Sequence, residues 1–318
     1  MLLDFSNQPI PKIHAGRRPV LPVLTSYQIK QEANRLLRSG LSAHAWQTLH
    51  HLTVGGIMSV GQLERIGVKS RTLQKYANLQ LLTRMPYSSP QMAVEFERWG
   101  LPFDRENAAE TSLNILGPIG LEIARMQGLS PEEGFLAYPV DRFMQQVVIS
   151  EIRLRLSQFA LEQGWQVKWV DKTQARLTTE EGQVILEPAA LMLFEKAGSV
   201  LPFFLEFQQK LDLRKIAQTI RMYEKARRTE QWVGETTMLH RFPPLLFVFS
   251  EQKVGLAYQQ TLAEQEPVRC TYYGKLLKGV LSAEADLGSW VNIHTKERET
   301  ILPKFDWGKC SPTKLCLT

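Results

Sequence analysis

The chain has 318 residues, of which 44% are hydrophobic and 22% are charged. These fractions are ordinary for a folded protein and exclude an intrinsically disordered chain, and no apolar run approaches the ~20 residues that a membrane-spanning helix needs. The formal net charge of +6 favours an anionic partner, of which nucleic acid is the commonest. The length predicts two domains.

Residues 1–26 are rich in proline and basic residues and are predicted to form an arm without a packed core of its own. Such an arm either contacts phosphates or is a disordered tail. Within it Asp4 precedes the basic residues, which is the reverse of the order in a secretory signal, so we expect a cytoplasmic protein. The cysteines Cys270, Cys310 and Cys316 show neither a disulfide framework nor metal-ligand spacing, and we expect no cofactor.

Residues 27–128 have a mostly helical pattern, and SVGQLERIGVKSRTLQKYANLQLLTRM is its most informative stretch. Ser59 and Gln62 form an S-x-x-Q capping box, which predicts a short helix that Gly67 ends. Ser70 is predicted to cap a second helix after a tight turn. A short helix, a turn with glycine and a second helix with basic and amide residues on its outer face are typical of a helix-turn-helix.

The second helix presents side chains that can read base edges and contact phosphates. The predicted DNA-binding residues here are Lys69, Arg71, Thr72, Gln74 and Lys75. LQLLTRM then reads as a strand and SLNIL as its partner, with a long loop between them. This order predicts a wing, in which Arg84 would contact DNA. Two short helices with a glycine turn also occur in many folds that bind no DNA, so that alternative stays open.

Residues 139–288 are predicted to form an α/β domain around a mixed sheet. DRFMQQVVISEIRLRLSQFALEQG predicts a long helix, WQVKWV a strand, and PAALMLFEKAGSVLPFFLEFQ two strands around a turn. A helix, the fully buried strand PPLLFVFS and a further helix follow. Residues 289–318 show little periodicity and are predicted to be an irregular tail.

The helix at LDLRKIAQTIRMYEKARR carries a basic stripe. Its members, which recur at helical spacing beside an apolar face, are Arg214, Gln218, Arg221, Lys225 and Arg228. The stripe is either a solvated helix surface or a phosphate-contacting ridge, in which each neutralised phosphate adds to the salt dependence of binding.

Three features together resemble the replication-relaxation family of plasmid and integrative-element proteins. A winged helix-turn-helix stands first, an L-G-P-x-G element follows in ILGPIGLEIARMQGLSPEE, and a long helix leads into EPAALMLF, PFFLEFQQ and KIAQTIRMY. The resemblance runs from about residue 42 to about residue 265, and the order and spacing of the features carry it. It implies an α/β chain, α+β overall, in which a winged helix-turn-helix precedes a degenerate PD-(D/E)xK nuclease-like α/β domain.

A PD-(D/E)xK core holds a divalent metal with an acid from its second strand and an acid and a lysine from its third. This chain has Ala189 where the first acid is expected and Gln208 where the last acid or lysine is expected. The residual candidates are Glu206, Glu151 and Glu187. Because Mg²⁺ demands near-octahedral oxygen ligands, we predict no catalytic residue and no metal site. An alternative role for Glu206 is to cap the following helix.

The sequence therefore predicts a double-stranded DNA-binding accessory protein of a plasmid or mobile element, serving replication, mobilisation or transfer, with a non-catalytic second domain. Besides DNA, the partners considered are a second copy of the chain on a repeated or palindromic site and a plasmid or transposon replication or transfer protein, with no membrane. One alternative is a metal-dependent endonuclease that uses Mg²⁺ with Glu151, Glu187 and Glu206. Another is a transcriptional regulator whose α/β domain senses a ligand or partner.

Overall fold

The computed structural model describes residues 23–302, except residues 130, 171, 180, 230–241 and 266. Most of the predicted arm, with Asp4, and the end of the predicted tail, with Cys310 and Cys316, lie outside the described residues. Within the described part the chain is a mixed α/β structure with two larger sheets and a short hairpin.

The N-terminal part combines helices with a small antiparallel sheet. Its helices are α1 (Ser26–Ser39), α2 (Ala43–Gly55), α3 (Val60–Arg65), α4 (Ser70–Asn78), α5 (Ser89–Arg98) and α6 (Pro118–Met126), with short 3₁₀ segments η1 (Ala108–Thr111) and η2 (Phe135–Ala137). Its strands are β1 (Met58–Ser59), β2 (Leu82–Arg84) and β3 (Leu113–Leu116). Strand β3 lies in the middle and pairs antiparallel with both others.

Helix starts in this part follow the capping signals of the sequence. The capping box of Ser59 and Gln62 is present, so the predicted helix start at Val60 is confirmed. Ser70, predicted to be the cap of the second helix, is instead its first residue, and Lys69 is the N-cap. Lys69 makes no side-chain capping bond; the side chain of Glu64 instead accepts a hydrogen bond from the Ser70 backbone N–H in the first turn, at 3.1 Å.

The long loop predicted between β2 and β3 contains helix α5, which corrects that expectation. Ser88 caps α5 with a capping box to Gln91, and Pro90 lies in its first turn. Met92 and Phe96, one helical turn apart, are buried in the core. A capping signal followed by apolar residues at helical spacing was therefore present within the segment that we expected to be a loop.

The L-G-P-x-G element has a packing role. A Cβ atom on Gly117 would lie 2.3 Å from the Gln80 carbonyl oxygen, and one on Gly120 would lie 2.2 Å from that of Leu81. The backbone N–H groups of Gly117 and Ile119 donate to these same carbonyls of Leu81 and Gln80. The two glycines thus let the start of α6 dock directly on the chain that leaves α4, and this contact fixes the end of α4.

The C-terminal part is built on a seven-stranded mixed sheet. Its helices are α7 (Val140–Glu162), α8 (Lys172–Ala175), α9 (Leu213–Arg228), α10 (Gln252–Ala263) and α11 (Leu277–Leu281). Its strands are β4 (Gln166–Val170), β5 (Leu177–Thr178), β6 (Val184–Leu186), β7 (Ala190–Lys196), β8 (Ser199–Gln208), β9 (Leu245–Phe249), β10 (Tyr272–Leu276), β11 (Ser289–Asn292) and β12 (Arg298–Thr300). The sheet order is β12-β11-β10-β9-β8-β7-β4, with β8, β9 and β10 parallel and the other pairs antiparallel.

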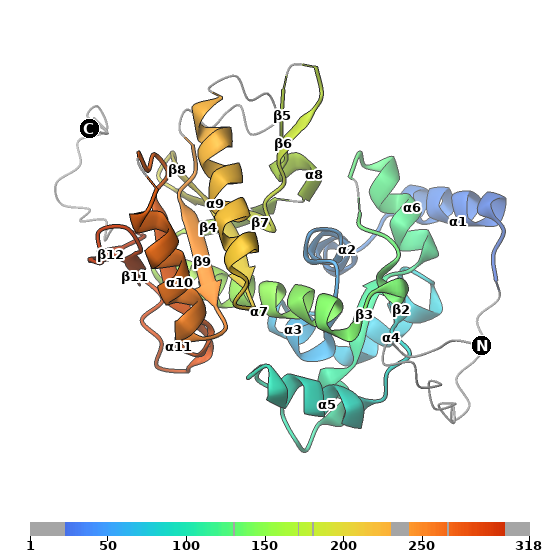
Figure 1. Ribbon diagram of the computed structural model, residues 1–318. Coiled ribbons are helices and arrows are strands. Elements are labelled where there is room, and N and C mark those ends of the chain that lie inside the picture. Colours follow the sequence, from blue (N-terminus) through green and yellow to red (C-terminus); the bar gives the residue numbers. More distant parts are fainter. Residues whose placement is uncertain are drawn as a thin grey trace.

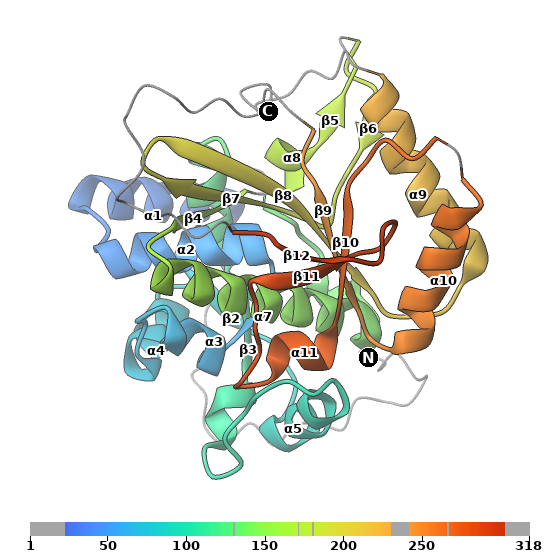
Figure 2. The ribbon, with the colours of Figure 1, turned by 90° about the vertical axis from the view of Figure 1, so that its left-hand side faces the viewer.

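The two faces of this sheet pack against different helices. Along β8, Phe203, Leu205 and Phe207 join the core that contains α7, whereas Phe204 joins the core beneath α9 and α10. This is the alternation expected of a strand that is buried on both faces. Figure 2 shows α9 and α10 together on one side of the strands, with α7 and α2 on the other.

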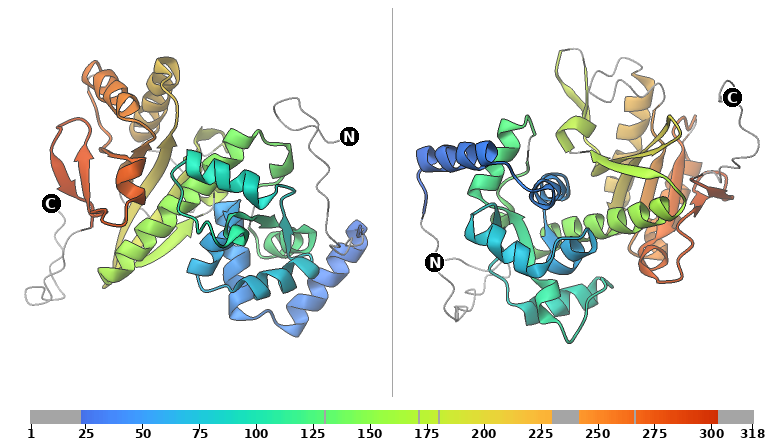
Figure 3. Two further views of the ribbon diagram at one scale, coloured as in Figure 1. Left: turned by 90° about the horizontal axis from the view of Figure 1, so that it is seen from below. Right: turned by 180° about the vertical axis from the view of Figure 1, so that it is seen from behind.

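Helix α7 joins the two parts of the molecule. It runs between the N-terminal helices and the large sheet in Figure 1 and in both views of Figure 3. Buried residues follow most of its circumference, as expected of a helix covered on all sides. One continuous hydrophobic core extends from Ala33 in α1 through α7 to Leu302, so the predicted regions 27–128 and 139–288 share a core.

Residues 289–300, expected to be irregular, contain β11 and β12 and extend the large sheet. Both strands are short and their side chains alternate little in polarity, which is why periodicity did not reveal them. Trp290 is buried and donates from its indole nitrogen to the Leu287 carbonyl, at 2.9 Å. No helix in the described part of the chain has the length and apolar character needed to cross a bilayer.

Candidate nucleic-acid interface

The outer face of α4 presents the residues that the sequence predicted. Leu73, Tyr76 and Ala77 anchor the helix in the core. Lys69, Arg71, Gln74 and Lys75 are exposed and Thr72 is partly exposed. Within residues 23–302, apart from the gaps given above, no carboxylate lies within ion-pair distance of Lys69, Arg71 or Lys75. These cations are therefore available to an external anion.

The two charged residues at the end of α3 are engaged within the protein. Glu64 accepts from the Ser70 backbone N–H, as described above. Arg65 donates to both carboxylate oxygens of Glu151 on α7, with Nη1 at 2.8 Å from Oε1. The acid and the arginine nearest α4 thus stabilise the fold, and within the α3–α4 helix pair the unpaired positive charge lies on the turn before α4 and on α4 itself.

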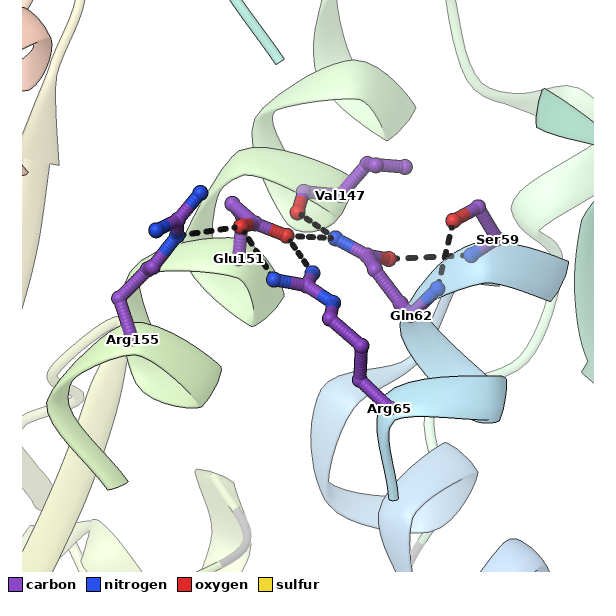
Figure 4. Close-up of polar contacts among 6 residues, drawn as sticks. All are labelled: Ser59, Gln62, Arg65, Val147, Glu151 and Arg155. Atoms are coloured by element: carbon purple, nitrogen blue, oxygen red, sulfur yellow. Dashed lines mark hydrogen bonds and ion pairs between the residues drawn. The ribbon is translucent and has the colours of Figure 1, made fainter. Parts of the chain in front are cut away.

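Glu151 is the centre of a buried polar network, drawn in Figure 4. Its side chain is 1% exposed and accepts from Arg65, from Arg155 Nε at 3.1 Å and from Gln62 Nε2 at 3.3 Å. Gln62 also donates to the Val147 carbonyl at 2.9 Å. A buried carboxylate is costly unless it is paired and hydrogen-bonded, and here both requirements are met.

This network fixes α3 to α7. Gln62 belongs at once to the capping box that starts α3 and to the set of donors around Glu151. Since α3 leads through a tight turn into α4, the position of α4 relative to α7 depends on these contacts. Glu151, a residual acid candidate from the sequence, is therefore a positioning residue for the helix pair.

A second contact between the two parts involves His51 on α2. Its ring meets that of Trp169 on β4 edge-on, with 4.8 Å between centroids, and the Arg153 guanidinium lies 5.1 Å from the Trp169 ring centroid. Burial, followed by the neighbouring charges of His50 and Arg153, lowers the pKa of His51 to about 4. His51 is therefore neutral at physiological pH and packs as an aromatic ring.

The basic stripe on α9 is exposed, as predicted. Arg214, Gln218, Arg221, Lys225 and Arg228 all face solvent, while Ile216, Ile220 and Tyr223 are buried. Glu224, 3% exposed, holds the helix by accepting from the backbone N–H groups of Arg269 and Cys270 and from the Tyr272 hydroxyl. Helix α9 lies across the sheet from α7, so its stripe and the α4 face are far apart in the fold (Figures 1 and 2).

Arg84 occupies a different setting from the α4 cations. It is the last residue of β2, pairs with Asn114 of β3 and is partly buried. The connection between these strands does not project as a free loop. Trp99, at the end of α5, lies 6.0 Å from Phe207 of β8 between ring centroids, and Arg98 lies 3.7 Å from Asp141 at the start of α7. The predicted wing segment therefore packs toward the large sheet.

Glu206 lies beside Ala189, the position where a PD-(D/E)xK core would carry its first metal-binding acid. Its Oε1 accepts from the Ala189 backbone N–H at 3.1 Å and from the Tyr223 hydroxyl of α9 at 2.5 Å. Burial and the Glu206 carboxylate raise the pKa of Tyr223 well above its usual value. The hydroxyl therefore stays protonated and donates to the carboxylate. The proposed capping of α9 is made instead by Asp212, which accepts from the Lys215 N–H.

The three residual acids are not brought together. Glu151 faces α3, Glu206 lies on the α9 side of the sheet, and Glu187 is exposed and forms an ion pair with Arg176 at 2.6 Å. Among the described residues, no group of three His, Cys, Asp or Glu side chains has the geometry to hold a metal ion. The acidic cluster required by the endonuclease alternative is thus absent from this part of the chain.

Sequence reasoning missed the contribution of α2 to the α4 surface. Ser42 and His44, at the start of α2, line a pocket of about 300 Å³ together with Lys69, Thr72 and Lys75 of α4. That this turn lies beside α4 is set by tertiary packing, which no local signal in the sequence carries. Comparison of the chain with family models, curated proteins and solved structures finds no match.

Proposed function

We propose that this protein is a double-stranded DNA-binding accessory protein of a plasmid or mobile element, acting in replication, mobilisation or transfer. The observation that carries the proposal is the outer face of α4. Lys69, Arg71, Gln74 and Lys75 are exposed there, and no carboxylate of the described residues is paired with the cations. Amide and guanidinium groups are the side chains that read base edges in a major groove, and lysines contact phosphates.

The surroundings of α4 support the same proposal. The order α2-β1-α3-α4-β2-α5-η1-β3, with β3 in the middle of a three-stranded sheet, resembles that of a winged helix-turn-helix with α5 inserted between the last two strands. In this assignment α4 is the recognition helix. The connection between β2 and β3 packs on the rest of the protein, so we assign DNA contact to α4 and not to a wing. The resemblance of the sequence to the replication-relaxation family supports a role in the replication, mobilisation or transfer of a plasmid or mobile element.

The C-terminal part is proposed to be nuclease-like but without catalysis. The positions compared with a PD-(D/E)xK core are Ala189, Glu206 and Gln208, of which Glu206 alone is acidic. Its carboxylate already accepts from Tyr223 and from the Ala189 N–H. A carboxylate engaged by two donors, without a second acid beside it, is a poor Mg²⁺ ligand. The proposed role of this part is to support α7 and to offer a further surface to DNA or a partner. A cytoplasmic location accompanies this function.

The test is a mobility-shift assay on a duplex selected by the wild-type protein from a random library. We expect Arg71→Ala and Lys75→Ala each to weaken binding roughly ten-fold, because each removes a charge-assisted contact. Lys278→Ala on α11 is the matched control, since Lys278 is an exposed lysine remote from α4, and it should bind like wild type. Unchanged affinity in both α4 variants would remove α4 as the recognition helix.

A cellular assay separates the accessory role from transcriptional regulation. Deleting the gene and complementing with Arg71→Ala should change plasmid copy number or transfer frequency while leaving the activity of promoters near the binding site unaltered. Changed promoter activity with unaltered copy number and transfer would favour the regulator instead.

A further inference from the structure

The pocket between α2 and α4 divides the proposed DNA-binding residues into two groups. It is lined by Ser42 and His44 at the start of α2 and by Lys69, Thr72 and Lys75. At 100° per residue, Arg71, Gln74 and Asn78 fall on one stripe of α4. Thr72 and Tyr76 are turned toward α2. Lys75 lies at the boundary between the stripe and the side that faces α2. Gln74 Nε2 donates to Asn78 Oδ1 at 3.0 Å, which joins two members of the stripe. The pocket and the stripe are therefore distinct surfaces.

The pocket is positively charged and framed by hydrogen-bonding groups. Lys69 and Lys75 lie at its edge, and Glu64, the acid nearest in sequence, is held by the Ser70 N–H. Ser42 Oγ lies 3.2 Å from the Tyr76 hydroxyl and accepts from the Ala45 N–H, so the start of α2 is tied to α4. Thr72 and His44 contribute a hydroxyl and an imidazole. The first N–H groups of α2 add partial positive charge.

The geometry points to a phosphate group as the ligand of this pocket. This inference rests on the proposed function. The pocket holds one phosphate of the DNA backbone with Lys69, Thr72 and Lys75. The stripe of Arg71, Gln74 and Asn78 faces the base edges. Phosphate contacts fix register and orientation, and base contacts supply the sequence preference. Thr72 and Lys75, predicted together with the base-reading residues, are thereby reassigned to the backbone.

The first experiment measures affinity against salt concentration by fluorescence anisotropy. Lys75→Ala should lower the slope of log affinity against log salt by about 0.9, the value for one phosphate contact, on two unrelated duplexes alike. Arg71→Ala should instead alter the sequence preference recovered from a random library, which Lys75→Ala should leave unchanged. Lys278→Ala is the charge-matched control, and circular dichroism with thermal unfolding verifies that every variant is folded.

The second experiment uses inorganic phosphate as the probe and follows the His44 ring signals by NMR at constant ionic strength. Wild type should show a saturable shift that Thr72→Val weakens and Lys75→Ala removes, and added duplex should compete with it. If the pocket binds backbone phosphate, added duplex should displace the inorganic phosphate. If the pocket binds free phosphate only, inorganic phosphate should stay bound when duplex is added.

The outcomes also separate this inference from the proposed function. If Arg71→Ala weakens DNA binding while Lys75→Ala keeps the wild-type salt slope and Thr72→Val keeps the wild-type affinity, the pocket assignment is overturned and the proposed function stands. If the wild-type protein binds no duplex, the proposed function fails. In that case a His44 shift with inorganic phosphate that Lys75→Ala abolishes supports a free-phosphate site, and the lack of any shift overturns the pocket.

Discussion

At the scale of single residues, Glu206 occupies a position that would bind metal in a PD-(D/E)xK core, and here it accepts hydrogen bonds within the protein. The Tyr223 hydroxyl and the Ala189 N–H both donate to its Oε1. The nearby hydroxyl of Tyr258 also has its pKa raised, by burial and then by Glu206. The hydrogen bonds from the Tyr223 hydroxyl and the Ala189 N–H satisfy the carboxylate oxygen without a metal ion. Glu206 thus links β8, the chain before β7, and α9.

His51 makes stability depend on pH, which can be measured. Its pKa in the fold is about 4, whereas an unfolded histidine titrates near 6.5. Between these values the unfolded chain binds more protons than the folded one, so the free energy of unfolding should rise as pH increases from 4 to 6.5. Urea unfolding across this range should show the rise, and His51→Phe should flatten it. An equal slope in His51→Phe, or an NMR titration of His51 near 6.5, would contradict the assignment.

At the scale of elements, the link between α3 and α7 should be measurable as a coupling energy. Glu151→Ala leaves Arg65 and Arg155 without their shared carboxylate, and because Arg65 is exposed and can be hydrated, the loss of stability should lie below the ~3–5 kcal/mol expected when the charge left behind is buried. In a double-mutant cycle, Glu151→Ala and Arg65→Ala should couple by about 1–3 kcal/mol in chemical unfolding.

The exposed ion pair of Lys253 with Glu251, at 2.8 Å, is the control for this cycle. An exposed pair is worth at most about 1 kcal/mol, so its coupling should be small. A coupling between Glu151 and Arg65 no larger than that of the control would show that the network does not hold α3 to α7. An undisturbed α4 in Glu151→Ala, judged by unchanged DNA affinity, would limit the role of Glu151 to stability.

The elements also show where sequence reasoning succeeds. The capping box at Ser59, the turn between β7 and β8 and the buried strand β9 follow local rules, and the structure confirms all three. Helix α5 was not predicted, although Ser88 and Gln91 form a capping box and the buried Met92 and Phe96 follow at helical spacing. Strands β11 and β12 were missed because pairing with β10 defines them, and no local signal carries that information.

For the candidate site, the sequence predicted which side chains of α4 are exposed, but it did not predict the contacts that these and the neighbouring residues make across the fold. Helical periodicity identified which side of α4 faces solvent, so Arg71, Gln74 and Lys75 were correctly placed on the surface. The partners of Glu151 and Glu206 could not be predicted, because Arg65 and Tyr223 reach them across long separations in sequence. The pocket beside α4 likewise depends on α2, whose position relative to α4 is a tertiary property.

At the scale of the whole molecule, the two basic surfaces cannot serve one short DNA segment. The stripe on α9 lies on one face of the large sheet, and α7, with the helix pair beyond it, covers the other. One chain therefore presents its cations on separate sides. If both bind phosphates, they bind different stretches of DNA or different molecules.

The separation predicts a difference between short and long DNA. A combined Arg221→Ala, Lys225→Ala and Arg228→Ala variant should bind a duplex of about one and a half helical turns, or roughly 16 base pairs, with wild-type affinity and salt slope, because only α4 engages it. On DNA several times longer the same variant should lose affinity and the ability to bridge two duplexes, measured by anisotropy and by pull-down of a second labelled duplex. Arg71→Ala should weaken binding to both the short and the long DNA.

A reduced salt slope on the short duplex in the α9 variant would mean that α9 reaches the same segment as α4. Equal binding of long DNA by wild type and the α9 variant would identify the stripe as a solvated helix face.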